Sequence, residues 1–158
     1  MVGDEAAPLR SYLEITYPMA NGQIKNWDEM EILWDYTFHN KLGLSKSDKS
    51  DKRVLLTEPA LNPRKNREKM GEIMFEKFNF GRIMFEYQAL LTLMAEGNRT
   101  GAVLDSGDGC SHIIPVYEGI IQHDAIRKMN IAGRHVTSRL IELMMHRGYS
   151  FNESADFE

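Results

Sequence analysis

The sequence has little of what marks secreted, membrane-spanning or nucleic-acid-binding proteins. Its one cysteine, Cys110, cannot form a disulfide within the chain, which predicts a reducing compartment. Residues 1–5 show neither the basic segment nor the apolar run of a secretory signal. No apolar run approaches the roughly 20 residues that a membrane helix needs. We therefore expect a cytoplasmic protein without membrane insertion.

Basic side chains are also in the minority. Lys and Arg number 19 against 23 Asp and Glu, so the formal net charge is −4 at pH 7. Nucleic-acid-binding domains normally carry a basic face, and this balance therefore argues against a nucleic-acid partner. The hydrophobic share of 42% and the charged share of 27% are typical of globular proteins. A chain of 158 residues is long enough for one domain with a core.

Apolar periodicity and turn residues predict alternating strands and helices along the chain. Trp27, Met30, Trp34 and Phe38 recur at helical spacing, which predicts a helix over 27–41 with this stripe in the core. Residues 45–52 are polar and predict a solvated loop. The other predicted helices begin after Asn62-Pro63 or cover 88–95 and 134–147; the predicted strands are 13–17, 23–25, 54–57, 83–85, 102–104, 113–117 and 120–122. Such alternation is typical of an α/β fold.

Two further predictions concern helix surfaces. Arg67 and Glu68, near the start of the second predicted helix, are expected to form an exposed ion pair. The last predicted helix carries an apolar stripe on one face and ends at Gly148, a typical C-terminal stop. The residues of that stripe are Val136, Leu140, Leu143 and Met144.

The stretch 100–119 carries the most distinctive chemistry of the chain. A short apolar run ends on Asp105, the small or flexible residues Ser106-Gly107-Asp108-Gly109 follow, and a second β-prone run covers 113–117. This pattern is typical of a hairpin whose turn presents several backbone N–H groups without bulky side chains. Successive amides of this kind form a nest for phosphate oxygens, and an adjacent acid can hold a divalent cation, directly or through water.

Taken alone, these residues leave three interpretations open. Asp108-Gly109 can be a plain hairpin turn. Asp105-Ser106-Gly107 also matches the D-S-G of an aspartic protease, which needs a second aspartate that shares one proton. The chain has no second D-T/S-G, so a protease would have to be a dimer. The third interpretation is half of a nucleotide–metal site.

Over its entire length the sequence resembles the actin family. The matching segments, in chain order, are 2–6, 17–18, 26–30, 55–58, 62–63, 66–70, 105–109, 115–119, 132–134 and 147–151. Residues 34–38 and the ending 154–158 favour the branch of the family that joins an actin-related partner to start a branch filament. The resemblance implies an α/β fold that is part of the actin/hexokinase-like ATPase fold. Residues 1–87 would belong to the first lobe, 88–97 to the hinge helix and 98–158 to the start of the second lobe.

The resemblance also implies roles for single residues, because family members clamp ATP or ADP with Mg²⁺ or Ca²⁺ between two lobes. The glycine turn matches the second phosphate hairpin of that clamp. Gln88 matches the glutamine that positions the attacking water, and His112 matches the histidine that helps polarise it. Asp105 matches the acid that orders the water shell of the metal. The implied cofactor-binding residues are Asp105, Ser106, Gly107, Asp108, Gly109 and Gly133.

The resemblance is partial, and the departures affect the expected activity. The matching segments include neither the first phosphate hairpin nor the segments that enclose the adenine, which predicts impaired nucleotide binding and at most a weak actin-type ATPase. The implied partners are actin and actin-related subunits of a multi-subunit complex that nucleates branched actin filaments, in the cytoskeleton. The alternative is a non-catalytic actin-like interaction fragment. Departures from the family pattern are Phe85, Glu86, Tyr87, Met94, Asn130 and His135.

Overall fold

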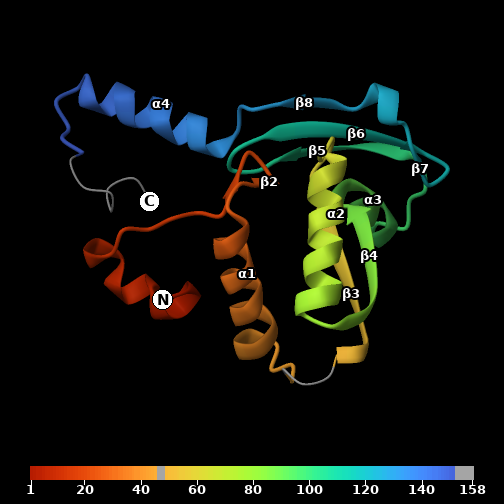
Figure 1. The fold of residues 1–158 in the computed structure, drawn as a ribbon. Helices are drawn as coiled ribbons and strands as arrows, with labels where there is room; N and C mark the ends of the chain where they lie inside the picture. The colour runs from red at the N-terminus through yellow and green to blue at the C-terminus, as the bar shows by residue number, and fades with distance from the viewer. Residues whose placement is uncertain (46–48, 152–158) are drawn as a thin grey trace.

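The structure is a computed structural model that describes residues 1–45 and 49–151 (Figure 1). The α-helices are α1 (Trp27–Asp35), α2 (Arg64–Glu72), α3 (Gln88–Ala95) and α4 (Gly133–Met145). The strands are β1 (Met19–Ala20), β2 (Gln23–Ile24), β3 (Lys49–Glu58), β4 (Phe80–Tyr87), β5 (Gly101–Ser106), β6 (Ser111–Tyr117), β7 (Ile120–Ile121) and β8 (Arg127–Met129). Short 3₁₀ turns cover Gly3–Glu5, Ala7–Tyr12 and His123–Ala125, and π-helical segments at Tyr36–Lys41 and Ile73–Lys77 extend α1 and α2.

The first region of the molecule is a β–α–β unit covered by α1. Strands β3 and β4 are parallel, and α2 with its π-helical extension connects them. Helix α1 begins where the Asn26 side chain accepts a hydrogen bond from the Glu29 amide at 3.3 Å. Phe38 meets Phe78 and Phe80 edge-on, at centroid distances of 5.1 and 5.0 Å. The buried core residues are Ile24, Met30, Trp34, Phe38, Met70, Ile73, Met74, Phe78 and Phe80.

The second region is an antiparallel sheet. Strand β6 pairs with β5 along one side, while β7 and β8 pair with opposite ends of β6. Helix α3 joins this sheet to β4 and contributes Ala89 and Leu90 to a smaller core with Ile114 and Val116. Helix α4 extends away from the sheet in Figure 1 and contains no buried residue.

Most predicted elements are confirmed. The helix over 27–41, the helix after Pro63, the helix over 88–95 and the long C-terminal helix are present within a few residues of the expected bounds. The predicted strands after residue 50 are also present, and the hairpin turn lies where the glycines predict it. Both tryptophans pack in or against the first core. The elements therefore follow the α/β order that the sequence indicates.

The predicted strand over 13–17 is wrong. The strand is Met19–Ala20, which pairs with Gln23–Ile24 around the Asn21-Gly22 turn. The carbonyl of Pro18 accepts hydrogen bonds from the amides of Lys25 and Asn26, so the hairpin closes at Pro18. The alternation that suggests a strand there arises in extended chain that lies outside the described sheets.

Three further expectations need correction. Part of the predicted loop over 45–52 is strand, because β3 begins at Lys49 where β4 supplies a parallel partner. The apolar run 54–57 suggests a buried strand, but Val54 and Leu56 on one face of β3 are half-buried, and Leu55 on the other face is 49% exposed. Arg67 pairs with Glu58 rather than with Glu68, which pairs with Arg64. Strand β8, with the sequence Arg-Lys-Met, has no apolar alternation and is missed by pattern. Residues 46–48 and 154–158 lie outside the described residues.

Candidate functional site

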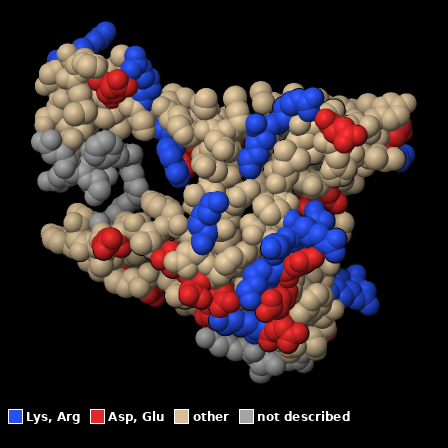
Figure 2. Space-filling model, turned by 45° about the horizontal axis from the view of Figure 1, so that its top comes forward, with Lys and Arg blue, Asp and Glu red and all other residues tan. Residues whose placement is uncertain are grey.

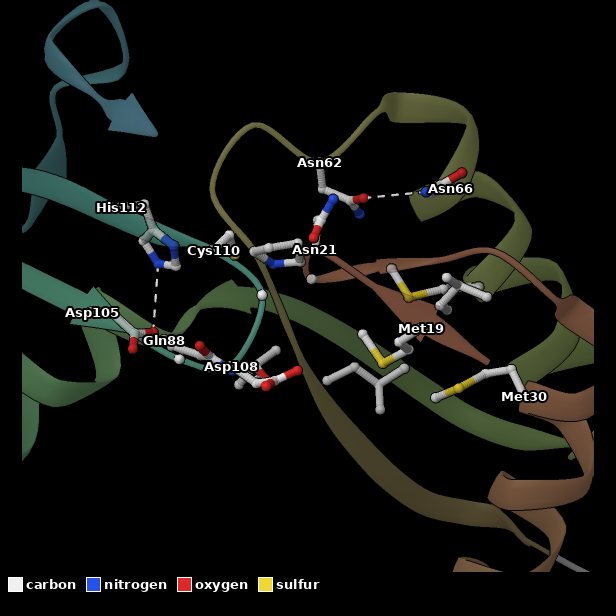
Figure 3. A pocket seen from close by; sticks show the side chains of 18 of the residues that line it. Met19, Asn21, Met30, Asn62, Asn66, Gln88, Asp105, Asp108, Cys110 and His112 are labelled. Carbon is white, nitrogen blue, oxygen red and sulfur yellow. Dashed lines mark hydrogen bonds and ion pairs between the residues drawn. The ribbon is translucent and has the colours of Figure 1, made fainter. Parts of the chain in front are cut away.

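A cavity of about 630 Å³ separates the first region from the tip of the β5–β6 hairpin. Its polar lining comes from both regions: the start of α3, the end of β3, the β1–β2 turn and the hairpin turn. Figure 3 shows Asp105, Asp108 and His112 on the hairpin side, Asn21 next to Cys110, and Asn62 and Asn66 farther across. Of the candidate residues, Gln88, Asp105, Gly107, Asp108, Gly109 and His112 line the cavity.

Backbone hydrogen bonds fix the conformation of the hairpin turn. The Gly107 amide donates to the Cys110 carbonyl at 3.1 Å and so closes the turn. The Gly107 and Asp108 carbonyls point to the start of α4, where they accept from the amides of Gly133 and Arg134 at 2.9 Å each. Within the described part of the chain, the Asp108 and Gly109 amides meet no acceptor. These two amides are therefore available for the oxygens of an anion.

Two candidate residues lie behind the turn rather than on the cavity wall. A Cβ on Gly133 would stand 3.2 Å from the Gly107 carbonyl oxygen, so glycine allows α4 to begin against the turn. Ser106 shares a 2.7 Å hydrogen bond with the Ser111 hydroxyl, which donates to the Ile131 carbonyl. Ser106 and Gly133 thus support the turn, and neither lines the cavity.

Asp105 and His112 face each other across the β5–β6 pair. They are register partners, and Nε2 of His112 lies 3.5 Å from Oδ2 of Asp105. The histidine is 5% exposed, and its Nδ1 has no hydrogen-bond partner among the described residues. The carboxylate of Asp105 thus faces an imidazole, whereas an aspartic-protease dyad needs a second carboxylate at this place. A buried nitrogen of this kind can accept a hydrogen bond from, or donate one to, a polar group in the cavity.

Gln88 occupies the first position of α3, directly after β4. Its Nε2 donates to Oγ1 of Thr57 at 3.3 Å, and Thr57 lies near the end of the neighbouring strand β3. The parallel pairing of β3 and β4 brings the two strand ends together, as is usual for sites at the carboxyl ends of parallel strands. The glutamine is thereby held at the cavity with its amide already ordered.

A buried ion pair supports the same strand end. Glu58 is 2% exposed. Its carboxylate accepts hydrogen bonds from Nε of Arg67 at 3.1 Å, from Nη2 of Arg67, and from Nδ2 of Asn62 at 3.1 Å. The hydrogen bond to Glu58 raises the pKa of the Arg67 guanidinium, so this group stays charged. Three donors satisfy the buried carboxylate and fix the end of β3 against the start of α2.

Charge around the turn is balanced rather than concentrated. Oδ2 of Asp108 accepts a hydrogen bond from Nη2 of Arg134 at 2.6 Å, and both side chains remain partly exposed. Basic and acidic side chains are likewise interspersed on the face shown in Figure 2. The described residues contain no cluster of three or more side chains that could hold a metal ion directly. A single carboxylate is enough for a cation that keeps most of its waters, as Mg²⁺ does when phosphates supply the other ligands.

Sequence reasoning missed several residues of the cavity. Asn21 adopts a positive φ of 52° in the β1–β2 turn, and a Cβ on Gly109 would lie 3.1 Å from the Asn21 amide nitrogen. Lys128 donates to the Asn21 carbonyl at 3.3 Å and ties β8 to the same turn. The Asn21-Gly22 dipeptide signals a turn, but no local pattern signals its distance from residue 109.

Some departures from the family pattern have a visible local role. Nδ1 of His135 accepts from the Ala132 amide at 3.2 Å and caps the start of α4. The Tyr87 ring meets the His123 ring at 5.9 Å, and Glu86 accepts from the Tyr87 amide at 2.9 Å. Met94 on α3 is exposed. These contacts thus lie at the start of α4 and around the junction of β4 with α3.

The fold and the site together define the class of protein to which this chain belongs. The family model for actin matches residues 1–156, and the chain belongs to the actin family. The expected α/β actin-like fold is thereby confirmed. None of the described helices has the length and apolar character required to cross a membrane.

Among the relatives, the chain is similar to proteins named actin-related protein 2. Identity is 54% to that of Saccharomyces cerevisiae, 54% to that of Acanthamoeba castellanii and 50% to that of Arabidopsis thaliana. Each comparison covers all 158 residues of this chain but only 40% of the relative. The chain thus spans two fifths of the length of these relatives.

Proposed function

We propose that the chain is an actin-related protein whose 105–109 hairpin forms the second-lobe half of a site for ATP with Mg²⁺ or Ca²⁺. The observation that carries this proposal is the pair of unengaged amides, at Asp108 and Gly109, on the wall of a cavity that Asp105 and His112 also line. The similarity to proteins named actin-related protein 2 supports a role with actin and actin-related subunits of a complex that nucleates branched filaments. Such a role belongs to the cytoplasm and the cytoskeleton.

Each site residue has a physical role in this proposal. The Asp108 and Gly109 amides would hold phosphate oxygens, and Asp105 would order a water on the cation. Gln88, fixed by Thr57, and His112, fixed by Asp105, would orient a water for attack. Bound MgATP would supply the phosphoryl group, and orientation with electrostatic stabilisation accounts for most catalysis of phosphoryl transfer.

The phosphate contacts of this chain come from one hairpin, which limits its affinity for nucleotide. Each missing charge-assisted hydrogen bond costs about 1.5–3 kcal/mol. We expect the 158-residue chain to show no micromolar affinity for MgATP in isothermal titration calorimetry, with weak binding at higher concentration. Micromolar binding would contradict the proposed half-site, because the described residues offer too few contacts for it.

The alternative function, a non-catalytic actin-like interaction fragment, has one observation in its favour. The apolar stripe of α4 is exposed along its length, with Val136 at 68% and Leu140 at 56%. Exposed apolar surface of this kind is typical of a contact surface. Binding of MgATP that is lost on Asp105→Asn would favour the nucleotide proposal, and binding unchanged by that substitution would favour the alternative.

A further inference from the structure

We propose that Cys110 is a covalent modification site for small uncharged electrophiles that enter through the cavity. Cys110 is the only cysteine of the sequence and directly follows the phosphate turn. It is 8% exposed and therefore shielded from bulk solvent, yet it belongs to the cavity lining together with Gly109 and His112. Figure 3 shows its side chain between His112 and Asn21, at the same wall.

Packing fixes the position of the thiol. A Cβ on Gly22 would stand 3.3 Å from Sγ of Cys110, so the sulfur rests against the backbone of the β1–β2 turn. The carbonyl of Cys110 accepts from the Gly107 amide at 3.1 Å, which holds the residue within the hairpin turn. An adduct on this sulfur cannot displace either turn without breaking such contacts. It must therefore extend into the cavity.

A second observation places an unpartnered polar atom beside the thiol. Cys110 directly precedes β6, His112 is the second residue of that strand, and both residues line the cavity. Nδ1 of His112 is buried and has no partner within the described residues, while Nε2 already faces Asp105. The free nitrogen therefore lies on the wall that carries the thiol, and an oxygen or nitrogen of a guest would satisfy it.

The modification of the thiol needs one co-reactant, the electrophile itself. With a hydroperoxide, the sulfur attacks one peroxide oxygen, an S–O bond forms and the O–O bond breaks. The sulfur is oxidised to sulfenic acid, and the released oxygen leaves as water or an alcohol with the proton of the thiol. With methyl methanethiosulfonate as the probe, an S–S bond forms, the S–SO₂ bond breaks, methanesulfinate leaves and the proton goes to solvent.

The test compares how strongly the fold protects the thiol from a small and a bulky reagent. Labelling of the native and the urea-unfolded chain is followed by intact mass, once with methyl methanethiosulfonate and once with dithiobis-nitrobenzoate. A thiol that is reached only by global unfolding reacts about 10³-fold or more slowly in the native chain with both reagents. We expect that protection for the bulky reagent and at least about tenfold less protection for the small one, which enters the folded cavity.

Equal protection factors for the two reagents would overturn the proposal, since access would then require unfolding. The matched control is a chain with Cys110→Ser and Thr137→Cys, because Thr137 is exposed on α4. Both reagents should label this control without protection. A control that discriminates between the reagents by size would also contradict the interpretation.

The proposed nucleotide site is tested separately in the same assay. Millimolar MgATP should slow labelling of Cys110 by the small reagent and leave the Thr137→Cys control unaffected. Cavity labelling that MgATP does not slow would retain the modification site and count against the nucleotide site. MgATP binding in calorimetry, combined with a native thiol that is inert to both reagents, would support the nucleotide site and overturn the modification site.

Discussion

Among the described residues, the core between α1, α2 and the β3–β4 pair holds nine buried residues, whereas the core between α3 and the β5–β8 sheet holds six and α4 has none. In the first region, Met74 is fully buried, and four aromatic rings meet edge-on in three pairs: Trp34 with Phe78, Phe38 with Phe78, and Phe38 with Phe80. In the second, Leu104 is 69% exposed, and α4 has no buried residue. We therefore expect most of the stability of the described fold to reside in the first region, whereas the 105–109 turn lies in the second.

The largest expected effect comes from a cavity in the first core. Met74→Ala removes a fully buried side chain and should lower the free energy of unfolding by about 2–5 kcal/mol in urea denaturation. The matched control is Leu140→Ala on α4, where an exposed side chain should change stability by less than about 0.5 kcal/mol. Similar losses at the two positions would contradict the difference between the regions.

The buried ion pair at the end of β3 should give the next effect. Arg67→Ala leaves the Glu58 carboxylate buried without its main partner and should cost about 1–3 kcal/mol. The value is at the low end for a buried pair because Arg67 is itself 47% exposed. Arg64→Ala, which removes only the exposed pair with Glu68, is the control and should cost less than about 1 kcal/mol.

The pH dependence of the Arg67 contribution has a definite sign. Because Glu58 raises the pKa of Arg67, the stabilisation is fully present below the unfolded-state pKa and is lost only as pH rises through the higher folded-state pKa. Both values are strongly alkaline. The stability difference between wild type and Arg67→Ala should therefore be flat with respect to Arg67 titration across the neutral range. A loss of that difference on moving from neutral to mildly alkaline pH would contradict this account.

The smallest effect concerns two glycines. Gly133→Ala places a Cβ 3.2 Å from the Gly107 carbonyl oxygen and should cost about 1 kcal/mol while it shifts the phosphate turn. Gly71→Ala in α2 meets only Phe85, at 4.0 Å, and should stabilise the helix by about 0.5–1 kcal/mol. Thermal melting shows whether each substitution lowers or raises the melting temperature. A stabilising Gly133→Ala would show that α4 does not begin tightly against the turn.

The local sequence pattern predicts the buried residues of the first region better than the pairing of its strands. Met30, Trp34 and Phe38 are predicted as core and are buried, because helical periodicity encodes a buried face directly. Periodicity alone does not reveal which strand a segment pairs with. That is why Lys49 appears as loop in the sequence but as strand in the fold, and why the alternation over 13–17 misleads.

The candidate site is predictable in its turn and not in its surroundings. Small residues at 106–109 predict a hairpin with open amides, and the fold brings Gln88, Asp105 and His112 to the same cavity. The approach of Asn21 to Gly109 and the pairing of Arg67 with Glu58 depend on contacts distant in sequence. The assigned catalytic, metal and cofactor roles, and the boundaries at 87/88 and 97/98, stay predictions.

The most direct test of the central claim is an amide NMR titration of the chain with MgATP up to millimolar concentration. The account predicts progressive shifts of the Asp108 and Gly109 amides, with no comparable change on the exposed face of α4. The Gly107 amide should move less, because it already donates to the Cys110 carbonyl. Unchanged Asp108 and Gly109 amides, or shifts concentrated elsewhere, would contradict the assignment of this turn as a phosphate site.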